Sequence, residues 1–135
     1  MTGGAGTHRA LSFLAFDFGT RRIGVASGNT LLRHATPLKT LSGERDARFV
    51  AIARLIDEWQ PDALVVGVPF HPDGAPHDNT RRAQAFARQL HGRFRLAVHQ
   101  VDERYTTTEA LADGAADADA AAAAIILDQF LRGLP

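Results

Sequence analysis

The most informative acidic residue in this sequence is Asp17, which directly follows the apolar run Phe13-Leu14-Ala15-Phe16. The run lies in a segment of strand length, 12–18, that is apolar on both faces, as expected of a central and fully buried strand. Burying a carboxylate there costs free energy unless a cation or several hydrogen-bond donors compensate it. Asp17 could instead only cap a turn at Gly19, but the apolar run before it favours a functional carboxylate.

A second acid, Asp119, lies on the apolar face of a helix predicted at 117–131. At 100° per residue, Asp119 shares a stripe with the apolar residues that must pack on a sheet. The members of this stripe are Ala122, Ala123, Ile126 and Phe130. Asp117 and Asp128 are predicted on the opposite, solvent-facing side. Acids are favoured in the first turn of any helix, which explains Asp117 equally well but does not explain an acid on the buried face.

Two further acids, Asp102 and Glu103, end a strand predicted at 96–101. Adjacent residues of a strand point to opposite faces, so only one of the two is expected to face the same site as Asp17. The spacing does not say which of them does.

Three carboxylates that converge at strand and helix ends suit hard cations with oxygen ligands, Mg²⁺ or Mn²⁺. Two such ions about 4 Å apart would activate a water and stabilise the leaving oxygen in phosphodiester hydrolysis, without a protein nucleophile. The histidines show no zinc-like pairing. Most are predicted to be surface residues, although His71 and His77 could contact a substrate from their loop.

The elements that must position these acids follow from the periodicity. We predict strands at 12–18, 23–27, 36–41, 63–68 and 96–101, and helices at 44–59, from 78 or 79 onward, from Thr106 onward, and at 117–131. The connection at Gly19 is too short for anything but an antiparallel hairpin. A meander of three strands followed by βαβ crossovers gives an α/β fold, a mixed five-stranded sheet with helices on both faces. This order fits the RNase H-like fold.

The two middle helices have readable apolar stripes and ends. In the first, Phe49, Ile52, Ile56 and Trp59 form the stripe, with Arg48, Arg54, Asp57 and Glu58 off it, and Pro61 stops the helix. In the second, Asp78 or Asn79 is the expected cap, and the stripe is Ala83, Phe86, Ala87 and Leu90. Thr106 and Glu109 have the spacing of a capping box, which predicts the helix that begins there.

The composition excludes several classes of protein. With 135 residues and 45% hydrophobic content, we expect one globular domain at 11–135, preceded by a flexible, Gly-rich stretch at 1–10. The absence of cysteine excludes disulfides, a thiol nucleophile and a thiolate zinc site. We find no signal-peptide core and no apolar stretch near the ~20 residues that span a bilayer, so we expect a cytoplasmic protein without membrane contact.

The formal net charge is zero, whereas proteins that bind nucleic acid non-specifically are often basic. Arginine nevertheless supplies nearly all the positive charge, and the pairs Arg21-Arg22 and Arg81-Arg82 lie beside predicted loops. Guanidinium groups make bidentate contacts with phosphates. The alternative is that these arginines serve only solubility.

Taken together, five segments resemble the YqgF, or RuvX, family of small RNase H-like proteins, described as pre-16S rRNA nucleases and Holliday junction resolvase homologues. The similar segments are Asp17-Phe-Gly-Thr-Arg-Arg-Ile-Gly-Val-Ala26, Ala35-Thr-Pro-Leu38, Val65-Val-Gly-Val-Pro69 with Asp73-Gly74, Asp102-Glu-Arg104 with Thr107 and Ala110, and Asp119-Ala120 with Ala122-Ala123 and Ile126-Leu127. They cover nearly the whole chain after residue 10. The chain departs from the family pattern at Asn29, where an acid is common, and near His71, where an asparagine is.

The resemblance implies a metal-dependent endonuclease acting on structured RNA or branched DNA. It assigns the catalytic and metal-ligand roles to Asp17, Glu103 and Asp119, with Asp102 as the backup for Glu103. It also implies nucleic-acid contacts from Arg22, Arg104 and the loop around Pro69 and Gly74; Arg21 and Arg81, which neighbour these elements, are further candidates. A homodimer is expected if the substrate is a four-way junction, because two matched strands must be cut.

Two other classes of protein compete with this interpretation. Actin-like and sugar-kinase ATPases also read Asp-x-Gly-Thr in their first phosphate loop, as residues 17–20 do here, but they need two such domains to enclose ATP. A non-catalytic interaction module of the same fold is the second alternative. The presence of all three acids argues against a module that has lost its catalytic activity.

Overall fold

The computed structural model describes residues 10–105 and 117–135. Its strands are β1 (Ser12–Phe18), β2 (Arg22–Asn29), β3 (Ala35–Ser42), β4 (Ala63–Val68) and β5 (Ala97–Asp102). Its helices are α1 (Arg45–Trp59), α2 (Asp78–Phe94), α3 (Ala118–Arg132) and the short 3₁₀ helix η1 (Glu103–Tyr105). The predicted elements within these ranges are confirmed, with ends shifted by one or two residues. The helix predicted from Thr106 lies outside the described residues.

The five strands form one mixed sheet in the order β3-β2-β1-β4-β5, so β1 is the central strand as predicted. β1 pairs antiparallel with β2, and β2 antiparallel with β3. β1 pairs parallel with β4, and β4 parallel with β5. The carboxyl ends of β1, β4 and β5 therefore meet at one edge, where Asp17 and Glu103 stand.

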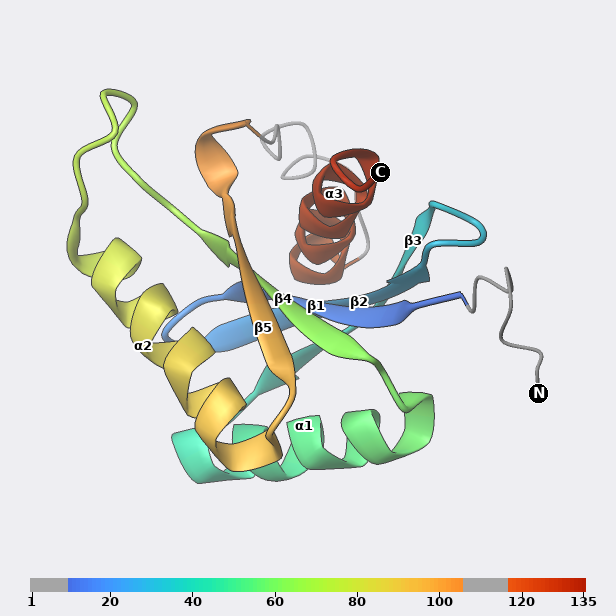
Figure 1. Ribbon diagram of the computed structural model, residues 1–135. Coiled ribbons are helices and arrows are strands. Elements are labelled where there is room, and N and C mark those ends of the chain that lie inside the picture. The colour runs from blue at the N-terminus through green and yellow to red at the C-terminus, as the bar shows by residue number, and fades with distance from the viewer. Residues whose placement is uncertain (1–9, 106–116) are drawn as a thin grey trace.

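Helices cover both faces of the sheet (Figure 1), with α3 on one side and α1 and α2 on the other. Side chains of β1 alternate between the two cores. Leu14 and Phe16 pack with α1 and α2, whereas Phe13 and Ala15 pack with α3. Asp17 has the same parity as Phe13 and Ala15, which places it on the α3 side. None of the helices within the described ranges has the length and apolarity needed to cross a membrane.

The buried face of α1 differs from the predicted stripe. Arg48, Phe49, Ile52 and Leu55 are buried, while Trp59 is 42% exposed. The sequence offered Leu55 and Ile56 side by side, and periodicity alone cannot choose between adjacent apolar residues. Arg48, predicted to lie off the stripe, is buried because its guanidinium donates to the carbonyl oxygens of the β1–β2 turn.

The N-cap of α2 is His77 rather than Asp78 or Asn79. Its ring Nδ1 accepts from the amide of Asn79 at 3.1 Å, and its own amide donates to the Thr80 hydroxyl at 3.0 Å. These reciprocal bonds satisfy the helix start without a carboxylate. The predicted apolar stripe of α2 is confirmed, since Ala83, Phe86, Ala87 and Leu90 are all buried.

Two acids of α3 fasten the helix to the edge strand β3. Asp117 is the N-cap, accepting from the amide of Ala120 at 3.1 Å and from the Thr40 hydroxyl. Asp128 accepts the amide of Ala35 at 2.8 Å. The prediction that Asp128 faces solvent is therefore wrong, because the edge strand β3 offers it an amide donor.

Candidate active site

Asp17 lies in register between two glycines. Its backbone pairs with Gly24 of β2 on one side and with Gly67 of β4 on the other. Glycine inside a strand often marks the close approach of another group. Because Gly24 and Gly67 have no side chain, other parts of the chain can approach the sheet on both sides of Asp17.

Glu103 occupies the space above Gly67. A Cβ atom at Gly67 would lie 2.6 Å from Glu103 Oε1 and 3.1 Å from its Cγ. From this position the Glu103 carboxyl forms a hydrogen bond with the Asp17 carboxyl. A larger residue at position 67 would force Glu103 to move away.

The start of α3 occupies the corresponding space above Gly24. A Cβ atom there would lie 1.8 Å from the carbonyl oxygen of Asp119. This contact brings Asp119 close enough to Asp17 for its negative charge to raise the pKa of Asp17. Residues that are more than a hundred positions apart in the sequence thus meet on the central strand.

Burial and mutual repulsion favour the protonated form of this carboxyl pair. The pKa of Glu103 is raised to about 8, first by burial, then by its hydrogen bond to Asp17 and by the charges of Asp17 and Asp102. The pKa of Asp17 is also raised, mainly by burial, with a smaller contribution from Asp119, while the hydrogen bond from Glu103 acts in the opposite direction. A proton shared between the two groups holds them together.

Asp119 faces a different partner. Its Oδ2 lies 2.9 Å from Nε of Arg22, in an ion pair whose side chains are 32% and 67% exposed, respectively. Within the described residues, no three histidine, aspartate or glutamate side chains stand close enough together to hold a metal ion. The structure therefore joins Asp17 to Glu103 and brings Asp119 near them, with the Asp119 carboxylate paired to Arg22.

Asp102 and Glu103 point to opposite sides of the sheet. Asp102 pairs in register with Val68, whose side chain packs on the α1 and α2 side. Its carboxylate accepts bonds from the guanidinium of Arg104, at 2.8 Å from Nη2 and 3.0 Å from Nε. These hydrogen bonds lower the pKa of Asp102. Asp102, the backup for Glu103, is thus away from Asp17 and serves to position Arg104.

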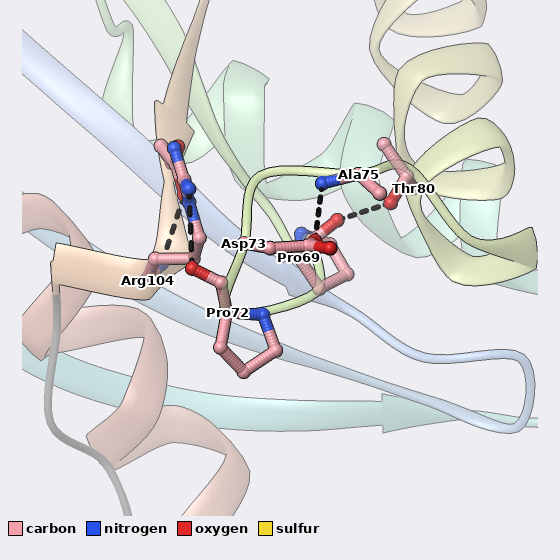
Figure 2. Close-up of polar contacts among 7 residues, drawn as sticks. Pro69, Pro72, Asp73, Ala75, Thr80 and Arg104 are labelled. Atoms are coloured by element: carbon pink, nitrogen blue, oxygen red, sulfur yellow. Dashed lines mark hydrogen bonds and ion pairs between the residues drawn. The ribbon is translucent and has the colours of Figure 1, made fainter.

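Arg104 also fastens the loop between β4 and α2 (Figure 2). Its Nη1 donates to the carbonyl oxygen of Pro72 at 3.5 Å, and its guanidinium lies 5.7 Å from the ring centre of Phe70. Gly74 has a φ of 92°, and a Cβ atom there would lie 2.9 Å from Arg104 Nη1. At the other end of the loop, the carbonyl oxygen of Pro69 accepts from the buried Thr80 hydroxyl.

The other predicted contact residues lie at the surface. Arg21 and Arg22 are exposed beside the β1–β2 turn, and Arg81 is exposed on α2, 3.5 Å from Asp78. The rings of His71 and His77 lie 4.7 Å apart, edge to face. Since His77 caps α2, its ring has a structural task.

Sequence reasoning did not predict that Gly24 and Gly67 make room for Asp119 and Glu103. Both are single glycines inside apolar strand segments, and that interruption was the available signal for close approach. It also missed Arg48, whose burial no periodicity indicated.

The sheet order and the acid on the central strand define an RNase H-like α/β protein. A solved structure with this fold is Thermus thermophilus RuvC in complex with a Holliday junction substrate. It matches 90% of this chain and 93% of its own, with a TM-score of 0.55 at 14% identity. That likeness concerns the fold.

The chain belongs to the RuvX family, described as Holliday junction resolvase, whose sequence profile matches residues 11–133. A relative from Polaromonas sp. strain JS666 is 69% identical over 92% of this chain and 90% of its own length. One from Paraburkholderia phytofirmans is 56% identical over 93% and 91%. Both carry the name "Putative pre-16S rRNA nuclease". The resemblance and the prediction of a hydrolytic nuclease are confirmed at the level of the family.

Proposed function

We propose that this protein is a divalent-metal-dependent endonuclease that hydrolyses phosphodiester bonds in structured nucleic acid. Asp17, Glu103 and Asp119 are its proposed catalytic residues and metal ligands. The observation that supports this most is the hydrogen-bonded pair of Asp17 and Glu103 on the central strand, with burial raising both pKa values. Two buried carboxyl groups with such shifted pKa values are typical of functional sites.

The donor set suits Mg²⁺ or Mn²⁺ in type and charge. Carboxylate oxygens are the ligands that these ions prefer, and a cation beside the pair would remove the repulsion that now retains a proton. When bound, such ions supply an activated water and stabilise charge on the leaving oxygen. Holding such an ion with all three acids would require two changes in the chain: the proton shared by Asp17 and Glu103 would leave, and the Asp119 carboxylate would turn from Arg22 toward Asp17.

The arginines around the site give the phosphate backbone its contacts. Arg22 and Arg21 are exposed beside the acids, and Arg22, once released from Asp119, is free to pair with a phosphate. Arg104 orders the loop that carries Pro69 and Gly74, and Arg81 is exposed in the first turn of α2, which follows that loop. These groups hold and orient the strand, and no side chain of the protein acts as a nucleophile.

For the substrate we propose the precursor of 16S rRNA, on the basis of the relative's name at 69% identity. A cytoplasmic location goes with this substrate. A four-way DNA junction is the second candidate, because the family is described as Holliday junction resolvase. Cleavage of a junction requires a two-fold symmetric dimer, so light scattering with and without a junction distinguishes the two candidate substrates.

The test is cleavage of a structured precursor RNA and of a four-way junction in Mn²⁺. Asp17→Asn should abolish cleavage while the protein stays folded, and Asp57→Asn, a change of the same type on the exposed face of α1, should cleave as the wild type does. Mn²⁺ binding, measured by calorimetry, should be weakened only in Asp17→Asn. Equal cleavage by Asp17→Asn and the wild type would refute the proposal, and binding of either substrate without cleavage would support a non-catalytic module instead.

A further inference from the structure

A second pocket lies on the face of the sheet opposite the carboxyl pair, between α1 and α2. Its volume is about 190 Å³, and its floor is built from the aromatic rings of Phe18, Phe49 and Phe86. Three arginines stand around this floor: Arg45 and Arg48 from α1, and Arg82 from α2. Phe18 directly follows Asp17 along β1, so the pocket and the carboxyl pair lie back to back across the sheet.

Positive charge is concentrated around this pocket. No lining residue carries a carboxylate, and within residues 10–105 and 117–135 none of the three arginines forms an ion pair. The only side-chain partner of Arg82 there is the amide oxygen of Asn79, at 3.4 Å. A fourth guanidinium, that of Arg93, lies 4.0 Å from the ring centre of Phe49. So much unpaired charge around one cavity favours an anionic ligand.

Arg48 provides the second observation. Its side chain is 8% exposed, and its Nε is a buried donor without a hydrogen-bond partner. Its Nη1 is used by the carbonyl oxygens of Gly19 and Thr20, at 3.0 and 3.2 Å. Burial and the charge of Arg45 lower the pKa of this guanidinium. An unsatisfied buried donor is costly, and the charge of this buried guanidinium adds to the positive potential that an anion in the pocket would meet.

We propose that this pocket binds a single phosphorylated nucleoside, with the phosphate on Arg45 and Arg82 and the base against the aromatic floor. Guanidinium groups pair with phosphates, and aromatic rings stack with bases of any sequence. The volume of about 190 Å³ is below the ~300 Å³ of sites that enclose a whole ligand of this size, so the pocket holds the base while the sugar and phosphate lie at its rim, beside the exposed Arg45 and Arg82. The choice of a nucleobase for the apolar part rests on the proposed function, whereas the anion follows from the arginines.

Two sources could supply this unit, a free nucleotide or the end of a nucleic-acid strand. The β1–β2 turn, with exposed Arg21 and Arg22, directly follows Asp17 of the carboxyl pair and Phe18 of the pocket, at the edge of the sheet between the two faces. A strand bound at the carboxyl pair would reach the pocket by passing over this turn. A free nucleotide needs no such path.

The test uses the full-length Asp17→Asn protein, which binds substrate without depending on cleavage, and NMR titration of backbone amides. The probes are adenosine 5′-monophosphate, a 5′-phosphorylated single-stranded oligonucleotide, adenosine and inorganic phosphate. Arg45→Glu with Arg82→Glu should weaken binding of the phosphorylated probes at least tenfold. Arg54→Glu with Arg88→Glu, exposed changes on the same two helices outside the pocket, should leave it within twofold.

The outcomes separate clearly. Shifts at Phe49, Gln89 and their neighbours with the mononucleotide support the free source, and shifts with the oligonucleotide alone support the strand. No shift at these residues with any probe, or equal weakening by the pocket and control variants, overturns the proposal. Phosphate binding as tight as the mononucleotide overturns the nucleoside part. Because binding is measured in a cleavage-deficient protein, failure here and failure of the nuclease proposal are distinguishable.

Discussion

The carbonyl oxygen of Asp119 lies where a side chain at Gly24 would begin. A Cβ atom at Gly24 would stand 1.8 Å from this oxygen and 2.9 Å from the amide nitrogen of Ala120. Both are backbone atoms at the start of α3, so they cannot turn aside as a flexible side chain could. Because Gly24 pairs with Asp17, the missing side chain sets how closely Asp119 approaches the carboxyl pair.

Gly24→Ala should therefore push the start of α3 away from the sheet. We expect the free energy of unfolding to fall by about 1–3 kcal/mol, as overpacking in a core does, and Mn²⁺ binding to weaken. Urea unfolding and calorimetry measure the two effects. The control is Gly92→Ala, since a Cβ atom at Gly92 of α2 meets nothing within 4 Å. That change should raise stability by roughly 0.5–1 kcal/mol, because alanine favours a helix. Equal stability of the two variants would contradict the close approach described here.

The raised pKa of Glu103 predicts how the stability of the metal-free protein depends on pH. Unfolding returns Glu103 from a pKa of about 8 toward its ordinary value of 4.5, so the folded state binds more protons between these values. Stability should be greatest below about pH 4.5 for this group and fall as the pH rises toward 8. One proton accounts for at most about 1.4 kcal/mol per pH unit. Urea unfolding in EDTA at several pH values measures the slope.

Glu103→Gln is the matched control for this pH dependence. The amide keeps the shape and a hydrogen bond to Asp17 but does not titrate, so the slope above pH 5 should flatten. A slope unchanged in Glu103→Gln would assign it to another group. In the wild type, Mn²⁺ should bind more tightly as the pH rises, since binding must release the shared proton.

Arg22 competes with a metal ion for the Asp119 carboxylate. Their ion pair is largely exposed, so Arg22→Gln should change the free energy of unfolding by less than about 1 kcal/mol. We expect Mn²⁺ binding to tighten, by up to about fivefold, and nucleic-acid binding to weaken. Calorimetry and a filter-binding assay measure the two effects separately. Weaker Mn²⁺ binding in this variant would mean that Arg22 supports the site rather than competing for Asp119.

Arg104→Ala should weaken nucleic-acid binding and reduce its dependence on salt. Loss of one phosphate contact lowers the slope of log affinity against log salt concentration by about 1. Arg54→Ala, an exposed change on α1, is the charge-matched control and should leave the slope unchanged. The same slope in Arg104→Ala and the wild type would remove Arg104 from the phosphate contacts, leaving it the role of holding Asp102 and Pro72 in place.

Much of the architecture could be predicted from local patterns. The doubly apolar run before Asp17 indicated the central strand, and the helical stripe that contains Asp119 indicated the face of α3 that packs on the sheet. Both are periodic signals within one segment, and the burial of each segment follows from its own spacing. The strand that ends at Asp102 and Glu103 was predicted in the same way, together with the rule that only one of them could face Asp17.

Packing between elements decided that Glu103, and not Asp102, faces Asp17. Glu103 reaches Asp17 because Gly67, a residue of a third strand, leaves the space empty, and Asp102 is held away by Arg104. The partners of Asp119 and Arg48 have the same origin, since each contacts a turn or strand distant in sequence. Sequence spacing carries the periodicity of one element. Contacts between elements depend on strand register and on the positions, such as Gly24 and Gly67, where the absence of a side chain lets another segment approach.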